Sequence, residues 1–314
     1  MSLALIARSE ARTEARLDLA SAVMREVPSG ERNLIVQLLA RTFVDTYAHS
    51  AAAGSPAQLV DWVDRMCDAH ADTPAVTKLF RGACRSLDDF FAAQGVAERE
   101  RKPLRSVEDS LREVLQKPRT TRAAAREHVD EVDAAVSGML ARLEGADPLT
   151  AEHSRSVSSW CGRLARRLSL SEKETTYVAR AGMIHDVGKV TTPPSILQAP
   201  RKLTEAEWVT MREHTTYGEQ IILEDERLGE FSLIVRAHHE RIDGHGYPDG
   251  RERDEVPLAA RIVTVADCFN AMIGRRPYRP AMAPSDALAQ LQLHTGSQFD
   301  PEIVAAMHEV VLQR

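Results

Sequence analysis

Several absences limit what this chain of 314 residues is expected to be. No apolar run approaches the ~18 residues that a membrane-spanning helix needs, so no membrane association is expected. The first residues carry Glu10 and Glu14 among arginines and contain no apolar core of the signal-peptide type. The 4 cysteines have no paired spacing, which argues against a disulfide framework. Together these absences predict a cytoplasmic protein.

The chain also lacks an excess of positive charge and has few aromatic residues. The 40 basic residues are outnumbered by 46 acidic ones, and neither half of the chain forms a basic module. Duplex nucleic acid is therefore not an expected partner. Aromatic residues make up 5% of the chain, and no segment shows the alternation of apolar and polar residues that marks a strand. The expected fold class is all-α.

The length suggests about two domains. Apolar stripes predict helices at 9–27, 31–48, 57–70 and 75–94, with a small-residue turn from Ala51 to Pro56. These helices would form a helical N-terminal domain over residues 1–115. Two interpretations of it remain open: a bundle with no chemistry of its own, which we favour, or a sensory or dimerising input domain.

Residues 116–146 are expected to form a connection built on one long helix at 119–143. Its apolar residues alternate in steps of three and four, as in a heptad repeat: Val129, Val132, Val136, Met139 and Leu143. The stripe fits a coiled coil that joins two chains in a homodimer, or a helix that packs on the following domain. We favour the second interpretation because three heptads are few. Gly145 and Pro148 then end the helix.

Adjacent pairs of metal-binding side chains mark the second half of the chain. His185-Asp186 and His238-His239 are costly to bury without partners, and a divalent metal would supply one. Other residues of the same types bring the candidate ligands to seven: His153, His185, Asp186, His214, His238, His239 and Asp267. Five imidazoles and two carboxylates exceed the need of one ion. They suit two ions that share a carboxylate.

Capping patterns place several of these residues on helices. Ser171-x-x-Glu174 is a capping box and opens a helix that is predicted to end with His185. Thr204-x-x-Glu207 is another, and it is predicted to open the helix that carries His214. Asp267 falls in a largely apolar helix, so its carboxylate is expected to have apolar surroundings with little water.

The order of these motifs resembles the HD-GYP family of cyclic di-GMP phosphodiesterases, a branch of the HD phosphohydrolases. The resemblance covers residues 147–314, and it implies a C-terminal helical bundle. The motifs that carry it are His185-Asp186-x-Gly188-Lys189, His214-x-x-x-Gly218, His238-His239-Glu-Arg-x-Asp243-Gly-x-Gly246-Tyr247-Pro248, Val256-Pro257-Leu258-Ala-Ala-Arg261 and Arg276-Pro-Tyr-Arg279.

The resemblance implies an enzyme that hydrolyses cyclic di-GMP to pGpG and/or GMP by a hydroxide that two metal ions activate. Iron or manganese is the expected metal. Asp186 would be the catalytic bridge between the two ions. The family pattern divides the other ligands into two groups, His153, His185 and Asp267 for one ion, and His214, His238 and His239 for the other.

The same resemblance assigns substrate contacts. Lys189 would hold a phosphate oxygen or protonate the leaving group, unless it is a solvated lysine near a helix end. Arg276 and Arg279 would clamp phosphate with their forked donors, unless they are ordinary surface arginines. The loop Gly246-Tyr247-Pro248 would lie beside the site. In the family this loop is also implicated in contacts with diguanylate cyclase domains.

Three positions depart from the family pattern. Leu149 stands where some members have an acidic ligand for a third ion, so two ions are expected. Asn270 replaces a common aspartate and is expected to weaken a substrate contact. His245 replaces a small residue in the loop. Among a spare ligand, a substrate contact and an exposed side chain, we favour exposure.

Two other functions compete with hydrolysis of cyclic di-GMP. One is a non-catalytic signalling module that binds a cyclic nucleotide or a diguanylate cyclase. A full set of seven ligands argues against it, because binding alone does not need them. The other is a phosphohydrolase of a different cyclic dinucleotide, which the sequence does not distinguish.

Overall fold

Helices are the main structure of the residues that the computed structural model describes. The described residues are 23–24, 27–31, 33–53, 56–70, 75–83, 111–112, 114–115, 122–274 and 281–312. Within these ranges there is no strand, only isolated bridges, and the predicted all-α class is confirmed. Over the same ranges, none of the helices combines the length and the apolar character needed to span a membrane. The chain divides into two compact units, Met1–Val132 and Asp133–Arg314.

The first unit has a core of aromatic and aliphatic side chains. It contains the short 3-10 helix η1 (Ser29–Glu31), α3 (Leu34–Ala53), α4 (Pro56–Ala69) and a helix over 75–83. The rings of Phe43 and Trp62 each lie 5.7 Å from the ring of Phe80, an arrangement that stabilises such cores. The predicted turn from Ala51 is wrong in its first residues, because α3 continues through three alanines, which favour the helix. The predicted helix over 9–27 lies almost wholly outside the described residues.

The predicted connecting helix is α7 (Arg122–Ala146), and it crosses the division between the units. Its stripe residues Val136, Met139 and Leu143, which belong to the second unit, are buried in the single chain. This burial agrees with the interpretation in which the stripe packs on the following domain. A homodimer through α7 stays a prediction.

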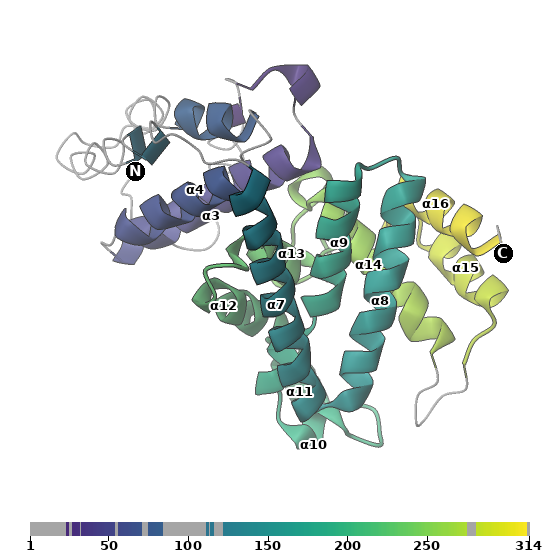
Figure 1. Ribbon diagram of the computed structural model, residues 1–314. Helices are drawn as coiled ribbons and strands as arrows, with labels where there is room; N and C mark the ends of the chain where they lie inside the picture. The colour runs from purple at the N-terminus through teal and green to yellow at the C-terminus, as the bar shows by residue number, and fades with distance from the viewer. Residues whose placement is uncertain are drawn as a thin grey trace. The chain divides into compact units, whose positions relative to one another are not determined.

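The second unit is built around three long helices that lie side by side (Figure 1). Helix α8 (Pro148–Arg167) packs against α9 (Glu172–Ile184) and α14 (Leu258–Ile273). The buried side chains of Val157, Cys161 and Leu164 recur every three or four residues and give α8 its core face. The remaining elements of this unit are η2 (Val187–Thr191), α10 (Pro194–Leu197), α11 (Glu205–Arg212), α12 (His214–Glu224), η3 (Gly229–Phe231), α13 (Ser232–Ala237), η4 (Arg253–Glu255), α15 (Pro284–Leu293) and α16 (Pro301–Leu312).

Both predicted capping boxes are present. Ser171 and Glu174 cap the start of α9 reciprocally, and Thr204 and Glu207 do the same for α11. The prediction that the second box opens the helix carrying His214 is wrong, because α11 ends at Arg212. The amide of Glu213 donates to the carbonyl of Thr210, which tightens the last turn, and His214 begins α12.

Candidate metal centre

Most of the predicted ligands lie where one helix ends or begins. His185 caps the end of α9, and Asp186 follows it. His214 is the first residue of α12, and His238 caps the end of α13 with His239 next. Two ligands come instead from within long helices, His153 on α8 and Asp267 on α14.

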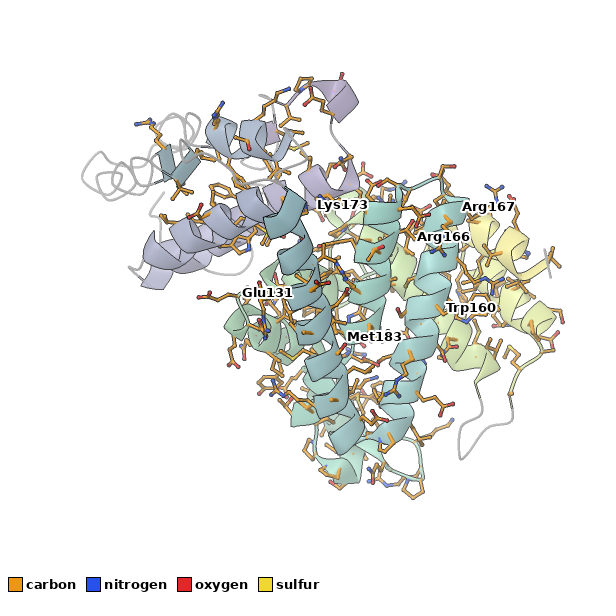
Figure 2. The ribbon with its side chains drawn as sticks, in the orientation of Figure 1. Glu131, Trp160, Arg166, Arg167, Lys173 and Met183 are labelled. Atoms are coloured by element: carbon orange, nitrogen blue, oxygen red, sulfur yellow. The ribbon has the colours of Figure 1, made fainter. Side chains whose placement is uncertain are left out.

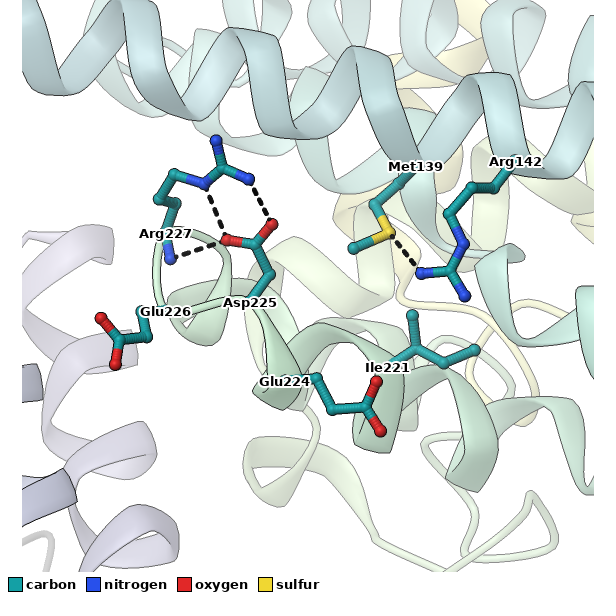
Figure 3. A pocket seen from close by; sticks show the side chains of 7 residues that line it. All are labelled: Met139, Arg142, Ile221, Glu224, Asp225, Glu226 and Arg227. Atoms are coloured by element: carbon teal, nitrogen blue, oxygen red, sulfur yellow. Dashed lines mark hydrogen bonds and ion pairs between the residues drawn. The ribbon is translucent and has the colours of Figure 1, made fainter.

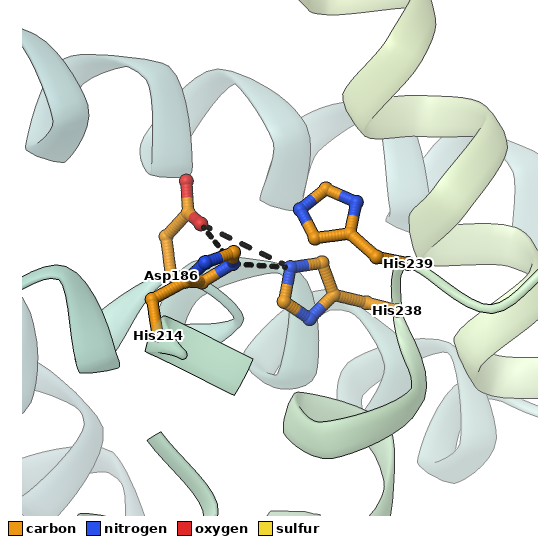
Figure 4. A group of neighbouring side chains, drawn as sticks. All are labelled: Asp186, His214, His238 and His239. Atoms are coloured by element: carbon orange, nitrogen blue, oxygen red, sulfur yellow. Dashed lines mark hydrogen bonds and ion pairs between the residues drawn. The ribbon is translucent and has the colours of Figure 1, made fainter. Parts of the chain in front are cut away.

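The structure brings six of the seven predicted ligands into two groups that share one carboxylate. Asp186, His214, His238 and His239 offer nitrogen and oxygen atoms that all lie within 4.8 Å of one another (Figure 4). His153, His185 and Asp186 form a second group by the same measure. Oδ1 of Asp186 lies 3.5 Å from Nε2 of His214, while Oδ2 lies 3.2 Å from Nε2 of His185. The two oxygens of Asp186 therefore face different groups, as a bridging carboxylate requires.

Backbone carbonyls fix the orientation of three imidazoles in the same way. Nδ1 of His185 lies 2.9 Å from the carbonyl of Gly182, three residues earlier. His214 and His238 repeat the arrangement with the carbonyls three residues before them, at 2.6 Å and 2.7 Å. A carbonyl only accepts, so each Nδ1 carries the proton and each Nε2 presents a lone pair to the centre.

These lone pairs have no protein partner that could satisfy them. Nε2 of His214 and Nε2 of His238 lie 3.3 Å apart, and neither carries a proton to give the other. Nε2 of His185 and Oδ1 of Asp186 are buried and have no hydrogen-bond partner. Buried acceptors that face one another are costly unless a cation lies between them. The donor set of imidazole and carboxylate therefore fits divalent metal ions.

The electrostatics of the centre favour three neutral imidazoles beside a charged carboxylate. Burial lowers the pKa of His214 to about 4 and that of His239 to about 3, and it lowers the pKa of His238 well below its usual range. Although burial acts to raise it, the pKa of Asp186 is held well below its usual value by His185 and Lys189. At neutral pH His214, His238 and His239 thus present lone pairs beside one anionic carboxylate, the forms in which these side chains bind metals. His185 differs, because burial acts to lower its pKa but the Asp186 carboxylate raises that pKa above its usual value.

Asp267 reaches the centre through His153. Its Oδ1 lies 2.8 Å from Nε2 of His153, so the two predicted ligands point at the same place. Burial acts to raise the pKa of Asp267, but the hydrogen bond and charge of His153 hold it far below its usual value. Asp267 is the one predicted ligand that is not in either group of converging atoms, and its part in binding an ion stays a prediction.

Asn270 lies behind His153, one helical turn after Asp267. Its side-chain amide is 2.8 Å from Nδ1 of His153, on the side of the ring that faces away from Asp267. If Nε2 binds a metal, Nδ1 must carry the proton, and Asn270 must then turn its oxygen toward the ring. We expected Asn270 to affect a substrate contact, whereas its position indicates support of a ligand.

Replacement of Asn270 by aspartate is therefore expected to tighten metal binding by about 10-fold, because a carboxylate raises the basicity of the imidazole that it supports. Asn270→Leu is expected to weaken it by a similar factor. Competition with a chromophoric chelator measures both. Asn33→Asp changes the same group in the first unit, where Oδ1 accepts from the amide of Val36, and should leave metal affinity unaltered. Equal affinities in all four proteins would contradict this role.

Lys189 lies against the shared carboxylate. Its Nζ donates to Oδ2 of Asp186 at 2.6 Å, and its side chain is 20% exposed. The ammonium thus contacts a predicted ligand and is partly exposed to solvent, which argues against the alternative of a lysine that is merely solvated near a helix end. Its contact with a substrate stays a prediction.

The loop that follows the two histidines is held by packing and by a carboxylate. A side chain on Gly246 would meet the backbone of Arg241 at 2.4 Å, so only glycine fits there. Glu240 accepts from the amides of Asp249 at 2.7 Å and Arg251 at 3.0 Å. Gly246 therefore has an evident structural role, and the contact of Gly246 and Pro248 with a substrate stays a prediction.

Two other positions of this loop differ in exposure. The ring of Tyr247 lies 4.9 Å from the ring of His239, with 30° between their planes. His245 has a side chain that is 82% exposed, as the sequence favoured. The predicted phosphate contacts Arg276 and Arg279 lie outside the described residues.

Sequence reasoning missed the carbonyls that orient the imidazoles and missed Arg212, whose guanidinium carbon lies 5.3 Å from the centre of the Tyr247 ring. No sequence pattern reveals a backbone acceptor. For Arg212 the signal was a basic residue two positions before a ligand, which is weak by itself.

A separate hollow of about 530 Å³ lies in the same unit, and none of the predicted site residues lines it (Figure 3). Its lining residues come from α7, the end of α12 and the following turn: Met139, Arg142, Ile221, Glu224, Asp225, Glu226 and Arg227. Asp225 and Arg227 pair with each other across 2.6 Å, so their charges are already compensated. The converging ligands, and not this hollow, are the candidate active site.

Comparison with known proteins agrees with the site. Residues 136–303 match a family model described as HD domain. A 3'3'-cGAMP-specific phosphodiesterase of Vibrio cholerae is 39% identical over 172 residues, which are 54% of this chain and 37% of that protein. The cyclic di-GMP phosphodiesterase response regulator RpfG of Xanthomonas campestris is 38% identical over 187 residues, 59% of this chain and 50% of its own length.

A cyclic di-GMP phosphodiesterase of Thermotoga maritima is 37% identical over 167 residues, 52% of this chain and 45% of that protein. The chain thus spans half or less of the length of these three relatives.

Proposed function

The chain belongs to the HD-domain family, in its HD-GYP branch, and on this premise we propose that its second unit hydrolyses cyclic di-GMP to pGpG and/or GMP. The observation that carries the proposal is the pair of ligand groups that share Asp186. Relatives named as phosphodiesterases of cyclic dinucleotides support it.

Two divalent ions are proposed to occupy the centre, with iron or manganese preferred. His153, His185 and Asp267 would hold one and His214, His238 and His239 the other, with Asp186 between them. When bound, such a pair supplies an activated water molecule and neutralises charge on the phosphate oxygens. The chain's own part is to hold the imidazoles at fixed angles through backbone carbonyls, so that little reorganisation is needed when substrate arrives.

Lys189 is proposed as the residue that meets the scissile phosphodiester. Its ammonium is already beside Asp186, where the phosphate would come to lie, and it has two further N–H groups to offer. It can bind a non-bridging oxygen or give a proton to the departing alkoxide. Arg276 and Arg279 are proposed to bind phosphate as well, on the strength of the family resemblance alone.

A second candidate is hydrolysis of 3'3'-cGAMP, because one relative at 39% identity is named for that activity. Both substrates are cyclic dinucleotides with two phosphodiesters, and the metal centre serves either. A non-catalytic module is the weaker alternative, since orphaned buried lone pairs would be costly to keep without an ion to bind.

The test is hydrolysis by protein that is purified without oxygen and reconstituted with iron(II) or manganese(II). Cyclic di-GMP and 3'3'-cGAMP are supplied together, and the products are separated by chromatography. We expect pGpG or GMP to form faster than products of the mixed dinucleotide. Faster loss of 3'3'-cGAMP would support the second candidate. Stoichiometric metal without any turnover would reject both.

The remaining proposals concern the rest of the chain. Residues 1–115 are proposed as a helical N-terminal domain, 116–146 as a connecting helix and 147–314 as the phosphodiesterase domain; a sensory or dimerising role of residues 1–115 is the alternative to a bundle without chemistry of its own. A contact between the Gly246-Tyr247-Pro248 loop and diguanylate cyclase domains, and a cytoplasmic location, stay predictions.

A further inference from the structure

A stack of three side chains extends outward from the metal centre. The ring of His239, a candidate ligand, lies 4.9 Å from the ring of Tyr247. The guanidinium carbon of Arg212 lies 5.3 Å from the centre of the same Tyr247 ring. These two distances place the charge of Arg212 no further than about 10 Å from a ligand ring, which is within the reach of a bound cyclic dinucleotide.

The guanidinium of Arg212 has no anionic partner among the residues that the structure describes. Other arginines of this unit are paired: Arg201 with Glu207 at 2.7 Å, and Arg241 with Asp243 at 2.6 Å. Arg212 is exposed and is oriented by the face of an aromatic ring instead. The ring of Tyr247 offers the guanidinium no carboxylate, so the charge of Arg212 and its planar fork of donors stay available to an anion.

We propose that Arg212 binds the phosphate of the cyclic dinucleotide that is not being hydrolysed, and that Tyr247 positions it. The inference rests on the proposed function. A cyclic dinucleotide carries two phosphodiesters, and only one of them can lie at the metal centre. The other remains an anion, and a planar fork of donors is the protein group best matched to it.

Tyr247 is a positioning residue in this arrangement. Its ring packs against His239 on one side and carries the guanidinium on the other, so it links the place of Arg212 to the place of a ligand. The aromatic ring, and not the hydroxyl, is what the arrangement needs. Tyr247→Leu should therefore reproduce part of the rise in KM seen on removing Arg212, and Tyr247→Phe, which keeps the ring, should show a smaller rise than Tyr247→Leu.

The experiment compares two substrates of the metal-loaded full chain. Cyclic di-GMP has two phosphates, and bis(p-nitrophenyl) phosphate has one. Arg212→Ala is expected to raise KM for cyclic di-GMP by about 10- to 100-fold, the usual effect of losing a hydrogen-bonded charge, and to leave kcat within about two-fold. KM for bis(p-nitrophenyl) phosphate and the metal content should not change.

Arg166→Ala is the matched control. Arg166 is an exposed arginine 13 residues after His153 on α8 (Figure 2), about 20 Å along the helix, so its loss changes net charge equally without touching the stack. An unchanged KM for cyclic di-GMP in Arg212→Ala, or an equal rise in KM for both substrates, would overturn the role of Arg212 and leave the proposed function standing. Wild-type protein that binds metal and cleaves only bis(p-nitrophenyl) phosphate would overturn the proposed function and this inference with it.

Discussion

Asp186→Ala is expected to lose both metal ions together and to lower turnover by far more than the 10- to 100-fold that follows loss of an outer partner of a ligand. Each oxygen of Asp186 faces a different ligand group, at 3.5 Å from His214 and 3.2 Å from His185. Removing the carboxylate takes one ligand from each ion and the negative charge that offsets both. No neighbouring side chain can replace a shared ligand of this kind.

The loss of activity should not come from loss of the fold. With Asp186 gone, His214 and His239 stay neutral, because burial already lowers the pKa of His214 to about 4 and of His239 to about 3. The carboxylate that raises the pKa of His185 is then absent, and burial acts to lower that pKa. Lys189, which loses its ion-pair partner in this variant, is 20% exposed and can turn its ammonium to water. The variant therefore leaves no buried uncompensated charge, which is the usual reason that breaking an ion pair unfolds a protein.

Elemental analysis after dialysis, together with circular dichroism and turnover, measures this result. Asp133→Ala is the matched control: it removes another ion-paired aspartate of the same unit, 2.7 Å from Arg180, with a side chain 57% exposed. It should keep both ions and full activity. Asp186→Asn keeps the size of the side chain, should Asp186→Ala fold poorly. Retention of two ions by a folded Asp186 variant would refute the shared bridge.

The sequence predicted the helices of the second unit through local signals that the structure keeps. Ser171 and Thr204 begin helices because each side chain accepts an amide hydrogen bond three residues on, and that contact depends only on nearby residues. The break between α11 and α12 was not predictable in this way. The break depends on the tight last turn at Glu213 and on the position of His214 beside the other predicted ligands. Neither feature follows from apolar periodicity.

For the site, sequence supplied residue types and the family resemblance supplied their grouping. What neither could supply is the direction of each ring. The carbonyl of Gly182 orients His185, yet any residue at position 182 would offer the same carbonyl. Helix α14 brings Asn270 to the far side of His153, and the two residues in this contact are 117 positions apart in the sequence. Contacts made by the backbone, or between distant segments, leave little trace in one sequence.

Gly188→Ala is expected to damage both stability and activity, because Gly188 is the point where η2 meets α12. A methyl group on Gly188 would lie 1.9 Å from the carbonyl oxygen of His214 and 2.5 Å from the amide nitrogen of Gly218. Both are backbone atoms, so no side chain can turn aside, and α12 must move as a whole. Gly218 faces Gly188 in return, which gives a physical reason for both glycines of the motifs.

The expected cost is at the upper end of overpacking, about 3 kcal/mol, which lowers the melting temperature of a unit of this size by about 6–12 °C. Turnover should fall by about 100-fold, since a shift of about 1 Å in a catalytic group has that effect and His214 moves with α12. Differential scanning calorimetry and a turnover assay with saturating metal measure the two losses.

Gly138→Ala is the matched control for this change. Gly138 lies within α7, and a methyl group there would meet nothing within 4 Å. The same substitution should raise stability by up to about 1 kcal/mol, because alanine loses less entropy in a helix, and should leave turnover alone. A loss of stability in Gly188→Ala and a gain in Gly138→Ala would show that the close backbone contact of Gly188, and not the helix propensity of alanine, causes the loss. A Gly188→Ala protein as active and as stable as wild type would mean that η2 and α12 are not in contact, and the placement of His214 beside Asp186 would fall with that contact.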